Sequence, residues 1–387
     1  MEESTMPGRC LTRSPLDESS HCPPTIDSSP YDIVFRMPIG NEGRKISRWY
    51  AIKVLADCPL QVDSEEIFPF WEGELPDASS FAAIAPHLYC IGGRRYLDPD
   101  SRETDAYKLD VTRPSKEWIP VMSMNSPRFL CNILVADGKL HVLAGDSSIY
   151  SCSNGLELEV FDPLTQKWEE VPDDPPVPLQ SQFISAVLED PTRIVVATQT
   201  GPCNRISDTI PSTFYAYDVR CRSWEKFAER ELDTRCPLGH LGITVTAGNA
   251  LYWLTEPTEL LSYNISQDLW LEGNLKGLGI SFLDGYDDPP FPGFGHLENQ
   301  KFYLLQCVSI HEIECVTVHV EPTQKELVIS VVAIRKYVTN LPSLVSDCLS
   351  LGKHEVQISE EASQESKNKR MKYNEEREDF DDSIMHD

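Results

Sequence analysis

The stretch EVFDPLTQKWEEVP, residues 159–172, carries a pattern that returns twice along the chain. The later copies are YAYDVRCRSWEKF (215–227) and LSYNISQDLWLEG (261–273). In each copy an aromatic residue is followed at once by Asp or Asn, and a Trp comes seven positions after the aromatic. The pairs are Phe161/Trp168, Tyr217/Trp224 and Tyr263/Trp270. A motif that recurs in this way predicts a repeated structural unit.

A short apolar strand precedes each copy, and two similar strands lie elsewhere in the chain. The five are LYCIGG (88–93), KLHVLAG (139–145), RIVVAT (193–198), ALYWLT (250–255) and KFYLLQ (301–306). They begin about 50 residues apart, a period typical of propeller blades. Each unit is expected to contain an inner strand, a loop, a second strand ending at the aromatic–Asp pair, a turn, and a third strand opening at Trp.

The repeated residue types have physical roles in such a unit. A four-stranded blade cannot bury both faces alone, so stacking against neighbours around a ring supplies the core. Trp and Tyr suit the wide gap between blades because each buries about 150–250 Å². The Asp or Asn begins a turn, where its side chain can accept hydrogen bonds from backbone amides downstream. The predicted structural positions are Gly92, Gly93, Trp118, Asp162, Trp168, Asp218, Trp224, Asn264 and Trp270.

These residues resemble the kelch repeat family of β-propellers. The resemblance rests on Gly92–Gly93 after LYCI, on the aromatic–Asp position, and on a spaced Trp followed by an apolar residue and Pro, as in WEEVP. It covers about 80–340 and extends to plant F-box/kelch proteins, for which the family implies substrate capture for a ubiquitin ligase. Residues 1–30 lack the Leu-Pro-led helical pattern of an F-box. The double glycine is missing from later repeats, so later blades are expected to turn differently.

The expected fold is an all-β, kelch-type propeller of six four-stranded blades spanning 31–345, with a seven-bladed or irregular five-bladed ring as alternatives. A disordered Ser/Pro-rich arm at 1–30 and a disordered charged tail at 346–387 are expected to flank it. Only five repeats are recognisable, so the stretch 31–76 should supply the remaining blade. A strand at 327–335 could complete that blade from the other end of the chain, which removes the open seam of the ring.

Composition limits the partners. The formal net charge of −27 disfavours duplex nucleic acid and anionic membranes, since phosphate neutralisation needs clustered Lys and Arg. The 12 cysteines include no C-x-x-C and mostly lie beside apolar residues, which predicts buried thiols in a reduced cytoplasmic or nuclear protein without a cofactor. MEESTMPGRC does not have the form of a secretory leader, and no apolar run approaches 18 residues, so a soluble protein is expected.

Long loops indicate a binding surface. The loops after the predicted inner strands are long in three consecutive repeats, at 94–104, 146–157 and 198–213, and shorter at 255–259 and 307–315. Equivalent loops of a propeller emerge on one face, and loops on a rigid scaffold often carry recognition; solvated loops without a partner are the alternative. The candidate binding residues are Arg94, Arg95, Tyr96, Tyr150, Asn204 and Arg205. Arg and Tyr are enriched at interface hot spots.

The rival class is a metal-dependent enzyme of the kelch, galactose-oxidase-like type that uses the central channel. His240 and His296 occupy matching places in two GHL repeats, so both could face the channel; the alternative is a hydrogen-bonded turn histidine. Cys307, His311 and Cys315 form a C-x-x-x-H-x-x-x-C string without an evident fourth ligand, and its cysteines are expected to face a core. No catalytic residue and no metal site is predicted.

The segment KNKRMK is a short basic cluster in acidic surroundings, with Lys367, Lys369, Arg370 and Lys372. It is either a nuclear-import signal or an ordinary charge run. The sequence therefore predicts a non-catalytic module that binds a protein partner, linked through its family to ubiquitin ligase pathways.

Overall fold

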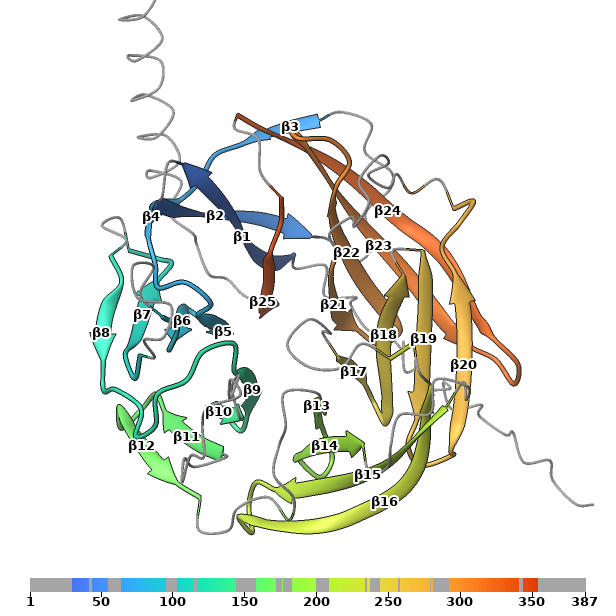
Figure 1. Ribbon diagram of the computed structural model, residues 1–387. Coiled ribbons are helices and arrows are strands. Elements are labelled where there is room, and N and C mark those ends of the chain that lie inside the picture. Colours follow the sequence, from blue (N-terminus) through green and yellow to red (C-terminus); the bar gives the residue numbers. More distant parts are fainter. Residues whose placement is uncertain are drawn as a thin grey trace, which may run out of the picture.

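The computed structural model of the chain shows a ring of β-sheets (Figure 1). The structure describes residues 30–41, 44–54, 64–94, 103–113, 117–143, 158–171, 176, 183–199, 209–233, 235–236, 244–256, 258–278, 280, 292–340 and 344–353. Within these residues, 25 strands form six sheets, which we number blades 1 to 6 in chain order. The chain is a six-bladed β-propeller, as the sequence predicts.

The strands of each blade follow in order from the centre of the ring outward (Figure 1). Blade 1 contains β25 (Asp347–Lys353), β1 (Tyr31–Asn41), β2 (Arg44–Val54) and β4 (Trp71–Glu74). Blade 2 contains β5 (Ser80–Ile84), β6 (His87–Ile91), β7 (Ala106–Asp110) and β8 (Ile119–Val121). Blade 3 contains β9 (Asn132–Ala136), β10 (Lys139–Leu143), β11 (Leu158–Asp162) and β12 (Lys167–Glu170).

The second half of the chain repeats this arrangement. Blade 4 contains β13 (Phe183–Leu188), β14 (Arg193–Gln199), β15 (Thr209–Asp218) and β16 (Ser223–Asp233). Blade 5 contains β17 (Val245–Ala247), β18 (Ala250–Glu256), β19 (Glu259–Asn264) and β20 (Leu269–Asn274). Blade 6 contains β21 (Gly293–Glu298), β22 (Lys301–Cys307), β23 (Glu312–Pro322), β24 (Leu327–Thr339) and β3 (Ser64–Ile67).

In blades 2 to 6 the innermost strand is not the one that the sequence predicts. The stretches predicted as inner strands, such as LYCIGG, lie in the second strands, and a strand such as β5 or β9 lies inside them. In blade 3 the two-residue turn Asp137–Gly138 joins β9 to β10, with φ of 50° and 69°. Two positive φ values match the twist of a tight hairpin. Such a short turn leaves the two strands almost continuous in sequence. The prediction that stretches such as LYCIGG are the innermost strands was therefore wrong.

Both ends of the described chain close the ring. β25 is the innermost strand of blade 1, where Cys348 pairs with Phe35 of β1, and β3 adds to the outer edge of blade 6, parallel to β24. Closure of the ring by strands from both ends of the chain is as expected. The prediction that residues 327–335 supply the closing strand was wrong. Residues 327–335 belong to β24, which pairs with β23 along its length. The short, partly polar strand 347–353 closes the ring, so the predicted limit at 345 stops one strand too early.

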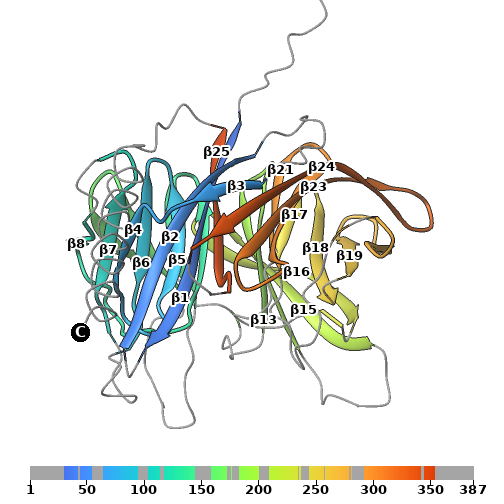
Figure 2. The same ribbon diagram turned by 90° about the horizontal axis from the view of Figure 1, so that it is seen from above.

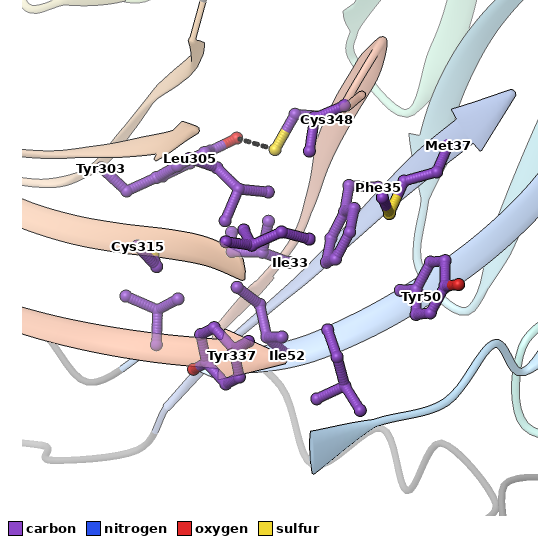
Figure 3. Close-up of a cluster of buried hydrophobic side chains, with 14 of the residues drawn as sticks. Ile33, Phe35, Met37, Tyr50, Ile52, Tyr303, Leu305, Cys315, Tyr337 and Cys348 are labelled. Atoms are coloured by element: carbon purple, nitrogen blue, oxygen red, sulfur yellow. Dashed lines mark hydrogen bonds between the residues drawn. The ribbon is translucent and has the colours of Figure 1, made fainter. Parts of the chain in front are cut away.

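A cluster of buried side chains lies at this seam (Figure 3). Ile33, Phe35 and Ile52 of blade 1 meet Leu305 and Tyr337 of blade 6. The six innermost strands also contact one another in sequence around the centre, in the order β25, β5, β9, β13, β17 and β21. The seam is therefore packed like the interior of the ring rather than left open.

The repeated aromatic pairs lie at equivalent points of successive blades. Phe161 is directly opposite Trp168, Tyr217 opposite Trp224, and Tyr263 opposite Trp270, with ring centroids 5.1, 5.2 and 4.4 Å apart. Each pair packs against the preceding blade, as Trp168 does in the cluster that contains Tyr89 of blade 2. The inner member is fully buried and the Trp is half-buried. The predicted wedge between blades is confirmed as an aromatic pair rather than a lone indole.

Blade 6 lacks this Trp, and aliphatic side chains of β24 take its place. Leu327 and Ile329 pack on blade 5 beside Gly273. A Cβ atom at Gly273 would lie 2.8 Å from Ile329 Cδ1 and 2.8 Å from Leu327 Cβ. The glycine therefore lets the two blades approach closely where no indole separates them.

The turns after the aromatic–Asp pairs share one geometry. Asp162 Oδ1 accepts hydrogen bonds from the amides of Leu164 (2.8 Å) and Thr165 (3.3 Å), and Asp218 Oδ1 accepts from Arg220 (2.9 Å) and Cys221 (2.7 Å). Asn264 Oδ1 accepts from the amide of Gln267 at 3.0 Å. The fifth residue of each turn has a positive φ; these are Gln166 (58°), Arg222 (55°) and Asp268 (52°). The predicted turn role of the Asp and Asn side chains is confirmed.

Candidate binding surface

The strands that flank the loops predicted to bind a partner meet those loops at one end of the ring. In an antiparallel blade, the connection from the second to the third strand lies at the same end as the connection from the outer strand to the next blade. We call the segments 92–105, 144–157, 200–208 and 122–131 the loop rim. The third predicted loop, 198–213, is shorter than expected, because residues up to 199 lie in β14 and those from 209 lie in β15.

Arg94 fixes the base of the first rim loop. Its backbone forms a bridge with Asp77, with N–O distances of 2.8 and 3.0 Å. Its guanidinium pairs with Asp77 Oδ2 at 3.2 Å and lies 5.8 Å from the centre of the Phe129 ring. The side chain stays 35% exposed. Arg94 thus has a structural contact and still offers part of its cation to solvent.

The other candidate binding residues stay predictions. Arg95, Tyr96, Tyr150, Asn204 and Arg205 lie outside the described residues.

The double glycine allows two backbone segments to cross at the rim. Gly92 and Gly93 have φ of 62° and 110°, and the Gly93 amide donates to Arg128 O at 2.8 Å. A Cβ atom at Gly92 would lie only 2.3 Å from that same oxygen. In blade 4, Ala197 and Thr198 instead continue β14 and pair with β15. Blade 4 does therefore turn differently, as predicted for a later blade. Its strand pairing continues at the positions where Gly92 and Gly93 end the pairing of β6 with β7 in blade 2.

A buried ion pair holds the connection between blades 2 and 3. Arg128 Nη2 lies 3.1 Å from Glu159 Oε1, and the two side chains are 5% and 0% exposed. Glu159 also accepts hydrogen bonds from the amides of Asn125 (2.8 Å) and Ser126 (3.1 Å). A buried carboxylate is tolerated when its oxygens are paired in this way. Glu159 therefore fastens the segment 122–131 to the third strand of blade 3.

Apolar side chains are exposed next to this connection. Ile119 and Met122 are 42% and 54% exposed, and Pro120 between them is exposed as well. The indole N–H of Trp168 donates to Met122 O at 2.6 Å, which ties this stretch to blade 3. Neighbouring exposed apolar side chains are a common feature of protein contact surfaces.

The channel candidates do not form a site in the described part of the chain. His296 lies on β21, and its Nε2 is 2.8 Å from Asn299 O in the following turn, while its ring lies 5.1 Å from that of Phe302. This is the turn histidine weighed as the alternative. His240 lies outside the described residues. Among the residues that the structure describes, no three His, Cys, Asp or Glu side chains gather as metal ligands.

The C-x-x-x-H-x-x-x-C string is part of the core and a turn. Cys307 and Cys315 are buried in the seam cluster, as predicted, and burial raises the pKa of the Cys307 thiol. His311 Nδ1 lies 3.2 Å from Thr339 O. Burial likewise raises the pKa of Cys348 to about 12. These thiols stay protonated near neutral pH, which suits core packing rather than metal binding or nucleophilic chemistry.

The structure also contains a groove that the sequence does not indicate. It lies between the long β15–β16 hairpin of blade 4 and the outer turn of blade 5. Trp270 stands at one side, and Arg230 Nε pairs with Asp268 Oδ1 at 3.2 Å. The lining residues are Thr209, Pro211, Ser212, Glu229, Arg230, Glu231, Asp268 and Trp270. The alternation in SWEKFAERELD was the available signal for the hairpin, which begins within the predicted loop 198–213.

Comparison with known proteins supports the expected resemblance. No protein-family model matches the chain. The chain is similar to three F-box/kelch-repeat proteins of Arabidopsis thaliana, with 31% identity over 131 residues, 33% over 98 and 35% over 106. The matches cover 34%, 25% and 27% of this chain and 34%, 24% and 24% of the relatives, so the chain matches about a third or less of their length. The similarity to plant F-box/kelch-repeat proteins is thereby confirmed.

Among solved structures, the protein YjhT is similar to this chain with a TM-score of 0.40 and 14% sequence identity, over 60% of this chain and 73% of that chain. The described residues include no helix long and apolar enough to cross a membrane. The basic cluster Lys367, Lys369, Arg370 and Lys372 lies outside the described residues.

Proposed function

We propose that the chain is a non-catalytic protein-binding module whose loop rim over blades 2 to 4 holds a protein partner. The observation that carries this proposal is the anchoring of the rim. The buried Arg128–Glu159 pair and the Arg94–Asp77 bridge fasten the segments at the bases of its loops to the blades. Rigid anchoring lowers the conformational entropy lost when a surface binds its partner. Exposed Ile119 and Met122 add apolar area beside the loops.

The relatives favour a role in protein recognition. Their printed names pair kelch repeats with an F-box. By analogy, the rim would select a substrate for a ubiquitin ligase, or it would bind its partner independently of one. The net charge of −27 favours a protein partner over duplex nucleic acid or an anionic membrane. The cluster at 367–372 would direct the chain to the nucleus in addition to the cytoplasm.

Affinity capture from plant extract tests the rim. Three full-length variants each replace one of 95–102, 146–156 and 200–208 with a short Gly-Ser turn. The matched control shortens the turn 323–326 between β23 and β24. This turn lies on blade 6, at the end of the ring opposite the loop rim. We expect at least one rim variant to lose a partner that the wild type and the control both retain. Equal recovery by all four proteins would reject the proposal.

Metal analysis of the purified chain separates this function from the rival enzyme. A binding module should carry no stoichiometric transition metal. One metal per chain that disappears in His240→Ala or His296→Ala would favour chemistry in the channel instead.

A further inference from the structure

The groove beside Trp270 carries more negative than positive charge. Its charged lining residues are three carboxylates and one guanidinium: Glu229, Glu231, Asp268 and Arg230. Arg230 Nε lies 3.2 Å from Asp268 Oδ1, and Lys226 pairs with Glu229 from outside the lining. Glu231 is exposed and has no cationic partner in the described part of the chain. The groove therefore has room for further positive charge.

Trp270 gives the groove an aromatic side and a hydrogen-bond donor. In blade 3 the equivalent indole, Trp168, donates to Met122 O at 2.6 Å. Trp270 makes no such hydrogen bond within the described residues, although its ring packs on that of Tyr263 with centroids 4.4 Å apart. The volume of the groove is about 750 Å³, within the range of about 300–1,000 Å³ common for ligand sites. An aromatic ring beside carboxylates suits the apolar stem and cationic head of Lys or Arg, and the N–H suits a peptide carbonyl.

The chain itself contains a segment of matching chemistry. KNKRMK, which lies outside the described residues, carries Lys367, Lys369, Arg370 and Lys372. Between 354 and 366 there are four Glu and no Lys or Arg, and between 373 and 387 there are seven acids and one Arg. The positive charge that follows β25 is thus concentrated in six residues, 367–372.

The last strand ends on the side of the ring that this contact needs. β25 lies beside β1 on the inner side of blade 1 and ends at Lys353, whose Nζ pairs with Glu298 Oε2 at 2.7 Å (Figures 1 and 2). In an antiparallel blade, the turn after the innermost strand and the turn after the third strand lie at the same end. Glu298 precedes the first kind of turn in blade 6, and Asp268 completes the second kind in blade 5. Lys353 and the Asp268 side of the groove therefore share one end of the ring.

The residues between β25 and the basic segment are numerous enough to reach the groove. From Lys353 to Lys367 the chain advances 14 residues, which span at most about 46–50 Å. Packed sheets lie about 10 Å apart, so opposite innermost strands of a six-membered ring are about 20 Å apart, and a four-stranded blade adds about 15 Å. The path from β25 across the centre to the outer side of blades 4 and 5 is therefore about 35 Å, within this span.

We infer that the segment 367–372 docks in the groove beside Trp270 of its own chain. Its cations lie against Glu229 and Glu231, and its backbone accepts a hydrogen bond from the Trp270 indole. A tethered segment meets its site at a millimolar effective concentration, so a contact that is weak between separate molecules forms within one chain. Docking covers the basic side chains and competes with any receptor that recognises them. The contact is internal to the chain, so it holds whether or not the loop rim binds a partner.

Fluorescence anisotropy of a labelled peptide of residues 365–374 tests the inference on full-length proteins. The tail variant has Gln in place of all four basic residues, Lys367, Lys369, Arg370 and Lys372, so its own segment no longer occupies the groove. We expect the tail variant to bind the peptide at least about tenfold more tightly than the wild type does. Adding Glu231→Lys to the tail variant should weaken peptide binding at least about tenfold, because a cation then faces the cations of the peptide.

The control adds Glu321→Lys instead, which makes the same change of charge at an exposed position of blade 6 outside the groove. It should leave peptide binding unchanged. Circular dichroism establishes that each variant folds; if Glu231→Lys does not, Glu229→Lys at the other exposed carboxylate of the hairpin takes its place. Equal affinity of the wild type and the tail variant overturns the inference, since the groove is then open to a separate partner. So does a folded tail variant that does not bind the peptide, or whose binding survives the charge reversal in the groove.

Discussion

Breaking the buried Arg128–Glu159 pair should cost more stability than any exposed ion pair of this ring. The two side chains are 5% and 0% exposed, so neither charge can be solvated in place when its partner is removed. Removing one partner of a buried pair typically costs about 3–5 kcal/mol, because the remaining charge is left uncompensated. Glu159→Gln keeps the shape of the side chain while removing its charge. We therefore expect a loss of about 3 kcal/mol or more for this variant.

A double-mutant cycle isolates the interaction. Arg128→Met removes the cation while keeping much of the side-chain volume, and the double variant Arg128→Met/Glu159→Gln leaves no buried charge at the site. The loss in the double variant should be smaller than the sum of the two single losses by about 2–3 kcal/mol. The assay is urea unfolding followed by Trp fluorescence and by far-UV circular dichroism, whose transitions must coincide for a free energy to be assigned.

Additive single losses would refute this reasoning, as would a loss below about 1 kcal/mol for both single variants, the range of a solvated pair. The matched control is Lys226→Met, which breaks an exposed pair with Glu229 and should leave the unfolding midpoint unchanged. Hydrogen exchange adds a local measurement. Glu159→Gln should speed exchange of the Asn125 and Ser126 amides, which donate to this carboxylate.

Three further predictions concern the ring itself. Burial lowers the pKa of His141 from 6.5 to about 4, so the unfolded chain takes up the proton at a higher pH than the folded chain does. The free energy of unfolding should therefore fall by about 3 kcal/mol as the pH drops from about 6.5 to about 4. Urea unfolding of wild type and His141→Phe at pH 7.5 and 4.5 checks this; a stability difference that is the same at both pH values would contradict it. Gly273→Ala should cost about 1–3 kcal/mol because its Cβ meets Ile329 and Leu327 at 2.8 Å, and Ile329→Ala in the same chain should recover part of the loss; no recovery would show that the contact is misassigned. Asp162→Ala should cost about 1–2 kcal/mol by freeing two amide donors, while Thr165→Ala in the same turn should cost little; equal midpoints in thermal unfolding would argue against the turn role.

The outer halves of blades 3, 4 and 5 could be predicted from the sequence because their residues are chemically distinctive. An aromatic, an Asp and a Trp at fixed spacing specify a hairpin whose turn and packing need those side chains, as in Phe161, Asp162 and Trp168. The innermost strands have no such mark. β9 and β17 are short and joined by tight turns to the strands that follow, so they merge with those strands in a hydropathy pattern. Their position depends on where the neighbouring blades leave room.

Ring closure was predictable in principle but not in detail. The need to cover an open edge follows from the physics of sheets. Which strand covers it depends on pairing between residues more than 300 positions apart, such as Phe35 and Cys348. β25 has weak strand propensity, while LVISVVAI reads as a strong strand, so local sequence favoured the wrong segment.

The candidate surface shows the same division. Arg94 and the double glycine are visible in the sequence as a motif. The Arg128–Glu159 pair is not, because its members are 31 residues apart, one in the connection between blades 2 and 3 and the other in β11, and nothing near either residue points to the other. The groove beside Trp270 could not be predicted from the sequence either. Packing between blades already accounts for this Trp, so its presence does not indicate a groove. Sites formed between blades depend on the ring being closed, which sequence patterns within one blade do not encode.

The ring closes at one boundary between blades, and its long loops belong to other blades. Both closing strands, β25 and β3, lie at the boundary of blades 1 and 6, and the seam core lies between those two blades. The longest rim segments belong to blades 2 to 4, away from that boundary. A change in a rim loop therefore alters neither the closing pairs nor the seam core, and adding residues to a surface loop costs little closure entropy. The loops of the rim can therefore change in sequence while the ring keeps its stability, provided that the anchors at the loop bases, such as Glu159 beneath the segment 122–131, are kept.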